Sequence, residues 1–211
     1  MLPHGPVGDL AYQEQSHSVR AFESQYPLLS EFSPMKPLDF HCTVADTELS
    51  GRLEALSSHG LHRVTLSKVS PWDWLRLWVS HLCLNASAPC GVVPESHLFG
   101  GDGYLLLRPV ADSRALLARL LALLSQGRRE PLPFFPNASK VFVKASRSAR
   151  SGVRPALDQA QAAWLGTGFG WAEADDAHVD YVYRREFPGD ERFGPLALEV
   201  WEPLFEAAEW S

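Results

Sequence analysis

Three runs of alternating apolar residues between Leu38 and Ser67 constrain this chain most, because they require a fold that contains a sheet. The runs are LDFHCTVA, TELSGRLEAL and GLHRVTLS, and the first two follow the two-residue period of a strand more closely than the third. SSHG at 57–60 separates the last two runs and is typical of a hairpin turn. We therefore expect three sheet-forming strands in the first third of the chain.

Helical patterns surround these runs. A helix is predicted from a cap at Asp9 to the residue before Pro27, another over PWDWLRLWVSHLCLNAS, and a third from Asp112 or Ser113 to Gly127. Two short strands, around SHLF and GYLLLRP, lie between the last two helices, and EPLPFFPNAS is predicted to be a loop. ALDQAQAAWLG, the segment after DD at 175–176, and FGPLALEVWEPLFEAAEW are predicted as later helices. This order predicts a mixed α/β (α+β) fold, with one sheet and helices against it.

The length of 211 residues allows one large domain or two small ones, and we expect one domain over residues 1–211, with loop-like segments at 1–8 and 188–194. The 45% hydrophobic content and seven tryptophans allow a substantial core. A net charge of −6 argues against a free-standing nucleic-acid binder but permits one basic face. Three irregularly spaced cysteines predict no disulfide framework, and neither a signal peptide nor a membrane span is visible. The expected location is the cytoplasm.

Positive charge is concentrated in SKVFVKASRSARSGVR, which contains no acid. Its cations could contact DNA phosphates, dock on the acidic last forty residues of the same chain, or form a solvated loop. The candidate DNA-binding residues are Lys140, Lys144, Arg147, Arg150 and Arg154.

Motifs for zinc, for a nucleophile or for a nucleotide phosphate are absent from the sequence. Histidine and cysteine form short pairs at 41–42, 59–62 and 81–83, none of which has the spacing of a zinc site. GTGFG at 166–170 and GGDG at 100–103 lack the Lys-Ser/Thr ending of a phosphate-binding loop and are predicted to be ordinary loops. Neither a metal site nor a cofactor is therefore expected in this chain.

The stretch SGRLEALSSHGLHRVTLSK has the layout on which many metal-dependent nucleases carry their carboxylates. Such a site needs an acid on one strand and an acid-x-Lys triplet on the next, because Mg²⁺ prefers anionic oxygen ligands. Glu54 can stand for the first acid, but Thr65, Ser67 and Lys68 mark a triplet region that has no carboxylate. The stretch therefore predicts a vestigial site without catalytic residues.

Two alternatives to a silent nuclease fold remain at this point. An active magnesium-dependent nuclease that uses Glu54 would need another carboxylate, for example from Asp39 or Glu14. A scaffold without DNA contact would use the aromatic C-terminus, with Trp201, Phe205 and Trp210, as an exposed docking face, unless these rings pack inside. Asp175 and Asp176 could bind a cation, but the preferred interpretation is that they cap the next helix.

Several segments in matching order resemble the C-terminal region of the RecC family, the gamma chain of exodeoxyribonuclease V. They are LPHGPVGDLAYQEQ, LSGRLEALSSHGLHRVTLS, LRLWVSHLCLNAS, ESHLF, EPLPFFPNAS, GWAEADDAHVDYVYRRE (with alanine where the family pattern has its second glycine) and EPLFEAAEWS.

This resemblance implies a PD-(D/E)xK nuclease-like core that has lost its catalytic residues, with extra C-terminal helices. It further implies a role in the RecBCD complex in double-strand-break repair by homologous recombination. The expected partners are RecB-like and RecD-like subunits, double-stranded DNA ends and the separated single strands, and no membrane is implied. The Mg²⁺ and ATP of such a complex would be used by the partner subunits.

Overall fold

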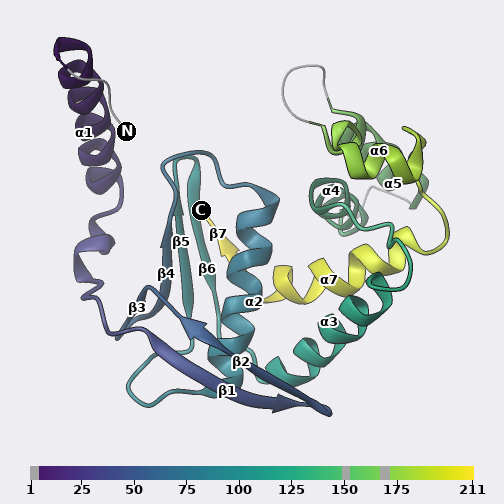
Figure 1. The fold of residues 1–211 in the computed structure, drawn as a ribbon, viewed down its shortest axis with the longest axis horizontal. Helices are drawn as coiled ribbons and strands as arrows, with labels where there is room; N and C mark the ends of the chain where they lie inside the picture. Colours follow the sequence, from purple (N-terminus) through teal and green to yellow (C-terminus); the bar gives the residue numbers. More distant parts are fainter. Residues whose placement is uncertain (1–4, 149–152, 167–171) are drawn as a thin grey trace. The chain divides into compact units, whose positions relative to one another are not determined.

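The computed structural model describes residues 5–148, 153–166 and 172–211, which form a mixed α+β structure (Figure 1). It consists of two compact units. The first takes in Met1–Ser70, Ser80–Ala111 and Glu209–Ser211, and the second takes in Pro71–Val79 and Asp112–Ala208. The chain thus leaves the first unit twice and returns to it twice. A single domain over residues 1–211 stays a prediction.

The first unit contains the strands and the N-terminal helix (Figure 1). In chain order its elements are α1 (Pro6–Gln25), the 3-10 helix η1 (Pro27–Glu31), β1 (Leu38–Val44), β2 (Thr47–Leu53), β3 (Leu56–Ser57), β4 (Gly60–Val64), β5 (Ser96–Gly100), β6 (Gly103–Leu107) and β7 (Ala208–Trp210). The long helix α2 (Pro71–Ser87) begins in the second unit and ends in the first.

A five-stranded mixed sheet in the order β3-β4-β5-β6-β7 is the centre of the first unit. β4 and β5 are parallel, with Leu61 opposite Ser96 and Val64 opposite Phe99, whereas β3–β4 and β5–β6 are antiparallel. Parallel neighbours need a long crossover connection, and α2 lies within it. Every residue of β5 is buried, as expected for a central strand.

β1 and β2 form a separate two-stranded antiparallel sheet, so the prediction of one sheet is wrong. The three predicted strand runs are present, but the second is interrupted after Leu53. Ala55 has a φ of 52°, in the left-handed region that a strand does not use. The chain therefore turns at Glu54 and Ala55 before β3 starts the larger sheet.

The second unit is helical and has an aromatic core. Its elements after the first half of α2 are α3 (Ser113–Gly127), α4 (Pro136–Ser146), α5 (Val153–Leu165), the 3-10 helix η2 (Glu173–Asp175), α6 (Ala177–Tyr183) and α7 (Phe193–Ala207). Trp164 and Trp201 are fully buried, and the rings of Phe142 and Phe193 lie 5.5 Å apart, centroid to centroid. Large buried rings of this kind contribute much of the apolar burial that stabilises a small helical unit.

Two predicted loops are shorter than expected. The first helix begins at Pro6, so residues 6–8 are helical rather than loop-like, while 1–4 lie outside the described residues. The last helix begins at Phe193, so residues 193–194 are also helical. Proline is tolerated in the first turn of a helix because the first amide groups have no partner within the helix, and Pro6 has this place in α1.

Two elements were missed by the sequence prediction. α4 begins at Pro136 inside the predicted loop EPLPFFPNAS, and it continues through the first half of the basic stretch. At the other end of the chain, Ala208–Trp210 forms strand β7 instead of extending the last helix. None of the helices in the described part of the chain combines the length and apolar character needed to cross a bilayer.

Candidate functional site

The candidate nuclease residues lie outside the strands on which the layout requires them. Glu54 is exposed, in the break between β2 and β3. β4 ends at Val64, so the triplet region around Thr65, Ser67 and Lys68 is irregular, although the Thr65 N–H still donates to the Phe99 carbonyl of β5 at 2.9 Å. The hydroxyls of Thr65 and Ser67 are hydrogen-bonded to each other at 2.9 Å, and the side chains of Ser67 and Lys68 are exposed.

The other carboxylates considered for a metal site are placed on different elements. Asp39 lies on β1, where its carboxylate is 3.6 Å from the Arg52 guanidinium of β2. Glu14 is exposed on α1. Over the described ranges 5–148, 153–166 and 172–211, no group of three or more His, Cys, Asp or Glu residues could hold a metal ion. The carboxylates are therefore dispersed in the described part of the chain.

The basic stretch divides between an inward-facing lysine and outward-facing cations. The ammonium of Lys140 lies 3.9 Å from the ring centroid of Trp74 and 5.7 Å from that of Trp201, all within the second unit. Cation–π contacts of this type hold a lysine against its own protein. Lys144 on α4 and Arg154 on α5 are exposed.

Two further cations complete this stretch. Arg147 is exposed just after α4, and its guanidinium carbon lies 5.7 Å from the Phe205 ring centroid. Arg150 lies outside the described residues. Among the described residues of this stretch, the exposed cations are therefore Lys144, Arg147 and Arg154.

The aromatic C-terminus does not form one exposed face. Trp201 is fully buried in the second unit and Phe205 is partly buried beside it, with ring centroids 5.5 Å apart. Trp210 belongs to β7 of the first unit and is 43% exposed. The interpretation that these rings pack inside is confirmed for Trp201.

The acidic pair before α6 serves a structural role. The Asp176 carboxylate accepts hydrogen bonds from the backbone N–H groups of His178 and Val179, at 2.9 and 3.2 Å. This is the predicted N-cap, which satisfies amide groups that have no partner within the helix. Asp175 forms an ion pair with Arg185.

A buried histidine joins α2 to the sheet, a feature that the sequence did not indicate. The His81 ring is fully buried, with Nδ1 2.9 Å from the Ser96 hydroxyl and Nε2 3.0 Å from the backbone carbonyl of Arg108. Burial lowers the pKa of His81 to about 4, although its hydrogen bond to the Arg108 carbonyl opposes the change. Burial also lowers the pKa of His97 on β5.

Because of these pKa values, the free energy of unfolding should fall as the pH drops from about 6.5 towards 4. The unfolded chain binds a proton at the ordinary histidine pKa near 6.5, whereas folded His81 resists protonation until about pH 4. The stabilisation is therefore complete above about pH 6.5 and is lost below it, by roughly 2 kcal/mol at pH 4.5. Urea unfolding of the wild type and His81→Gln between pH 7.5 and 4.5 would measure this dependence.

The free energy of unfolding of His81→Gln should fall less steeply than that of the wild type as the pH drops. His178→Gln, on the exposed surface of α6, is the matched control and should follow the wild type. Equal slopes for wild type and His81→Gln would show that His81 is not the group responsible.

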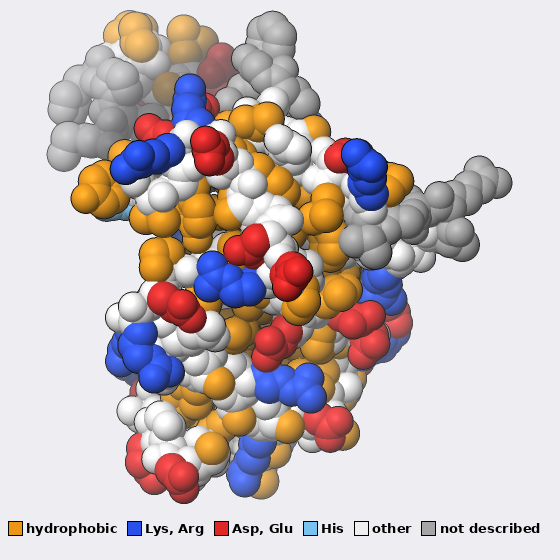
Figure 2. All heavy atoms as spheres, turned by 90° about the vertical axis from the view of Figure 1, so that its right-hand side faces the viewer, with side chains coloured by type: hydrophobic (Ala, Val, Ile, Leu, Met, Phe, Trp, Pro, Cys, Tyr) orange, Lys and Arg blue, Asp and Glu red, His pale blue; other side chains and the backbone are white. Residues whose placement is uncertain are grey.

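Charges of both signs are mixed on the face shown in Figure 2, with Lys and Arg beside Asp and Glu and with apolar side chains between them. This face therefore does not present the continuous basic stripe that characterises an autonomous DNA-binding domain. A contact with nucleic acid on it would depend on a few side chains.

Sequence comparison places most of the chain in one family. A family model described as "RecC C-terminal domain" matches residues 1–147. The RecBCD enzyme subunit RecC of Escherichia coli is 24% identical over 198 residues, which cover 89% of this chain and 17% of that protein. The RecBCD enzyme subunit RecC of Mycobacterium tuberculosis is 28% identical over 180 residues, which cover 75% of this chain and 16% of that protein. The chain thus spans only a small part of the length of these curated relatives.

Proposed function

Because the chain belongs to the RecC C-terminal domain family, we propose that it is a catalytically silent, nuclease-like module of a RecBCD-type complex. Its role would be to support subunit assembly, the splitting of the DNA duplex and the guidance of the separated strands. The biological process would be double-strand-break repair by homologous recombination, in the cytoplasm. The partners would be RecB-like and RecD-like subunits, which would use the Mg²⁺ and ATP of the complex.

The proposal that this module does not catalyse cleavage rests on the dispersed positions of its carboxylates. Magnesium catalysis needs several converging anionic oxygens, because a single carboxylate does not compensate for the partial dehydration of this ion. Glu54 is exposed between the end of β2 and the start of β3, and the Asp39 carboxylate is close to the Arg52 guanidinium. A metal held by Glu54 alone would be weakly bound and poorly oriented.

The central sheet supports the proposal of a degenerate PD-(D/E)xK-like core. A nuclease core of that kind is a mixed sheet flanked by helices, and here parallel β4 and β5 are joined through α2, with antiparallel strands on either side. Under this proposal, the β3–β4 hairpin would lie where an active relative carries its ligands.

Contact with DNA would be made by the basic stretch, whose exposed cations in the described part of the chain are Lys144, Arg147 and Arg154. Each cation that neutralises a phosphate adds to the affinity and to its salt dependence. Lys140 would contribute less, since its ammonium already packs against Trp74.

A forked DNA substrate labelled at both ends would test both halves of this function. With Mg²⁺, the wild-type chain and Glu54→Ala should show the same background level of cleavage. Binding of the same fork should weaken as salt rises, and Lys144→Glu should weaken it about tenfold, because one attractive phosphate contact becomes repulsive. Lys36→Glu, at an exposed site before β1, is the matched charge-reversal control and should bind like the wild type.

Magnesium-dependent cleavage that disappears in Glu54→Ala would contradict the silent module and favour an active nuclease. Fork binding that Lys144→Glu leaves unchanged would remove the basic stretch from the DNA contact. A chain that does not bind the fork at any salt concentration would instead favour a scaffold without nucleic-acid contact.

A further inference from the structure

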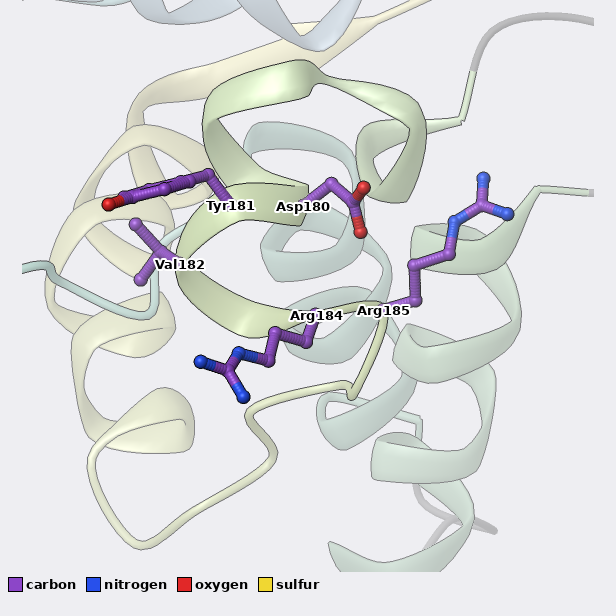
Figure 3. A pocket seen from close by; sticks show the side chains of 5 residues that line it. All are labelled: Asp180, Tyr181, Val182, Arg184 and Arg185. Carbon is purple, nitrogen blue, oxygen red and sulfur yellow. The ribbon is translucent and has the colours of Figure 1, made fainter.

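The end of α6 presents an aromatic ring and a cation together at the surface. Tyr181 is 87% exposed. It lies beside an open hollow of about 730 Å³, which is lined by Asp180, Tyr181, Val182, Arg184 and Arg185 (Figure 3). This helix end follows the part of the chain that matches the RecC C-terminal family.

The two arginines after the helix have an uncommon backbone. Arg184 ends α6 with a φ of 49°, and Arg185 follows with a φ of 60°. The left-handed region after a helix is usually occupied by glycine, because a Cβ atom is disfavoured there. This conformation directs the two guanidinium groups to different sides of the helix end, as Figure 3 shows.

The charges on these two sides differ. Arg185 extends to the same side as Asp180 and forms an ion pair with Asp175. Arg184 extends to the side of Tyr181, away from Asp180 (Figure 3). Among the described residues, the Arg184 guanidinium has no carboxylate within ion-pair distance. Within the described part of the chain, one cation without an ion pair therefore lines the same hollow as one exposed aromatic ring.

We propose that Tyr181 and Arg184 form a contact site for single-stranded nucleic acid. An unpaired base would stack on the Tyr181 ring, and a neighbouring phosphate would be bound by the Arg184 guanidinium. Single strands are bound in this way by other proteins, which combine aromatic platforms with cations along the backbone. The inference rests on the proposed function in assuming that separated DNA strands pass along this chain.

Two features favour this ligand over a duplex or a protein. In a duplex the faces of the bases are stacked on each other, so an exposed ring can stack only on an unpaired base. The centre of a protein interface is depleted in charged residues, whereas Tyr181 and Val182 stand among the charged residues Asp180, Arg184 and Arg185. The surrounding surface therefore favours a ligand that is itself charged and carries separate aromatic faces.

The test measures the binding of fluorescent oligonucleotides to the 211-residue chain by anisotropy, over a series of salt concentrations. Tyr181→Ser should weaken binding of a thymidine 20-mer about tenfold, since stacking of one base on an aromatic ring has a comparable effect. Tyr181→Phe, which keeps the ring, should bind like the wild type. Arg184→Gln should lower the slope of log affinity against log salt by about 0.7, as the loss of one phosphate contact predicts.

Further arms identify the ligand and separate this inference from the proposed function. A uridine 20-mer shows whether RNA is bound as well, and a blunt duplex should be insensitive to Tyr181→Ser. A 20-mer with 5-iodouridine should crosslink to the peptide that contains Tyr181. Circular dichroism at 222 nm should give the same melting temperature for wild type, Tyr181→Ser and Tyr181→Phe, because an exposed ring contributes little to stability.

The result that would overturn the site is normal single-strand affinity in both Tyr181→Ser and Arg184→Gln while Lys144→Glu weakens binding. In that case the chain binds DNA through the basic stretch and the proposed function stands without this site. Loss of partner-subunit binding in Tyr181→Ser, with normal oligonucleotide binding, would also overturn it and would assign the ring to a protein interface. A wild-type chain that binds no nucleic acid would contradict the proposed function itself.

Discussion

Gly60→Ala is expected to lower the free energy of unfolding of the first unit by about 3 kcal/mol or more. Gly60 is the first residue of β4, directly after the β3–β4 turn, and its φ of 109° is one that L-residues rarely adopt. An added Cβ atom would also lie 2.2 Å from the backbone carbonyl oxygen of Glu95 and 2.9 Å from that of Val93. Because both neighbours are backbone, the strain can be relieved only by moving the turn.

The same carbonyl takes part in the junction of the parallel strands. The N–H of Leu61 donates to the Glu95 oxygen at 3.1 Å, so displacing this segment disturbs the start of the β4–β5 pair. Urea unfolding would measure the loss of stability. Hydrogen exchange should show faster exchange at Leu61 and Leu98 than in the wild type, which would locate the change in this sheet.

Gly51→Ala is the matched control for this substitution. Its added Cβ atom would lie 2.8 Å from Cε1 of Phe40, which is the far end of a side chain and can move. The expected loss for Gly51→Ala is less than about 1 kcal/mol. An equal loss in the two variants would show that the backbone of the β3–β4 turn has no special requirement for glycine.

Glu173→Ala should destabilise the second unit by about 3 kcal/mol. The buried Glu173 carboxylate accepts hydrogen bonds from the backbone N–H groups of Asn137 and Ala138, at 2.7 and 2.9 Å. These groups belong to the first turn of α4, where amides have no partner within the helix. Alanine would leave two buried donors without an acceptor.

The neutral substitution Glu173→Gln separates charge from hydrogen bonding. Burial raises the pKa of the Glu173 carboxyl group, and the two backbone donors oppose that change. Glutamine keeps one acceptor oxygen and removes the buried charge, so its loss should be about half of that for alanine. Glu199→Ala, on an exposed position of α7, should unfold at the same urea concentration as the wild type. A loss in Glu199→Ala that matches Glu173→Ala would refute the capping role.

Local pattern was sufficient where an element's own residues determine it. α2, α3 and the strand runs at β1 and β2 have clear periods, and the predicted helix ALDQAQAAWLG is present as α5, which ends before Gly166 with its φ of 75°. The N-cap at Asp176 was also predictable, because its hydrogen-bond partners, the N–H groups of His178 and Val179, lie only two and three residues further along the chain. In each case the deciding interactions lie within a few residues.

Distant contacts explain the elements that were missed. α4 begins in a proline-rich segment, and its first turn is capped by Glu173, 36 residues away from Asn137 in the sequence. β7 is three residues long, and its position depends on Arg108, whose guanidinium binds the Glu209 carboxylate at 2.9 Å. No periodicity in the sequence signals either contact.

The site was predictable in composition but not in geometry. A shortage of carboxylates around Glu54 can be read from the sequence, and catalytic silence stays a prediction. The left-handed turn at Ala55, which puts Glu54 off the strand, has no signature because alanine rarely adopts that conformation. Tyr181 and Arg184 were also missed, since one exposed ring near one arginine is common in any sequence.

The position of β7 has a consequence for how the protein is made. This strand pairs with β6, and Ser211 exchanges backbone hydrogen bonds with Tyr104 at 2.8 and 3.0 Å. In the sequence, however, all the helices from α3 to α7 lie between the two strands. On the ribosome, the sheet would remain one strand short until residue 211 had left the exit tunnel. Until then the edge of β6 would be open to pairing with another nascent chain, which makes this edge the point where a chaperone would matter most.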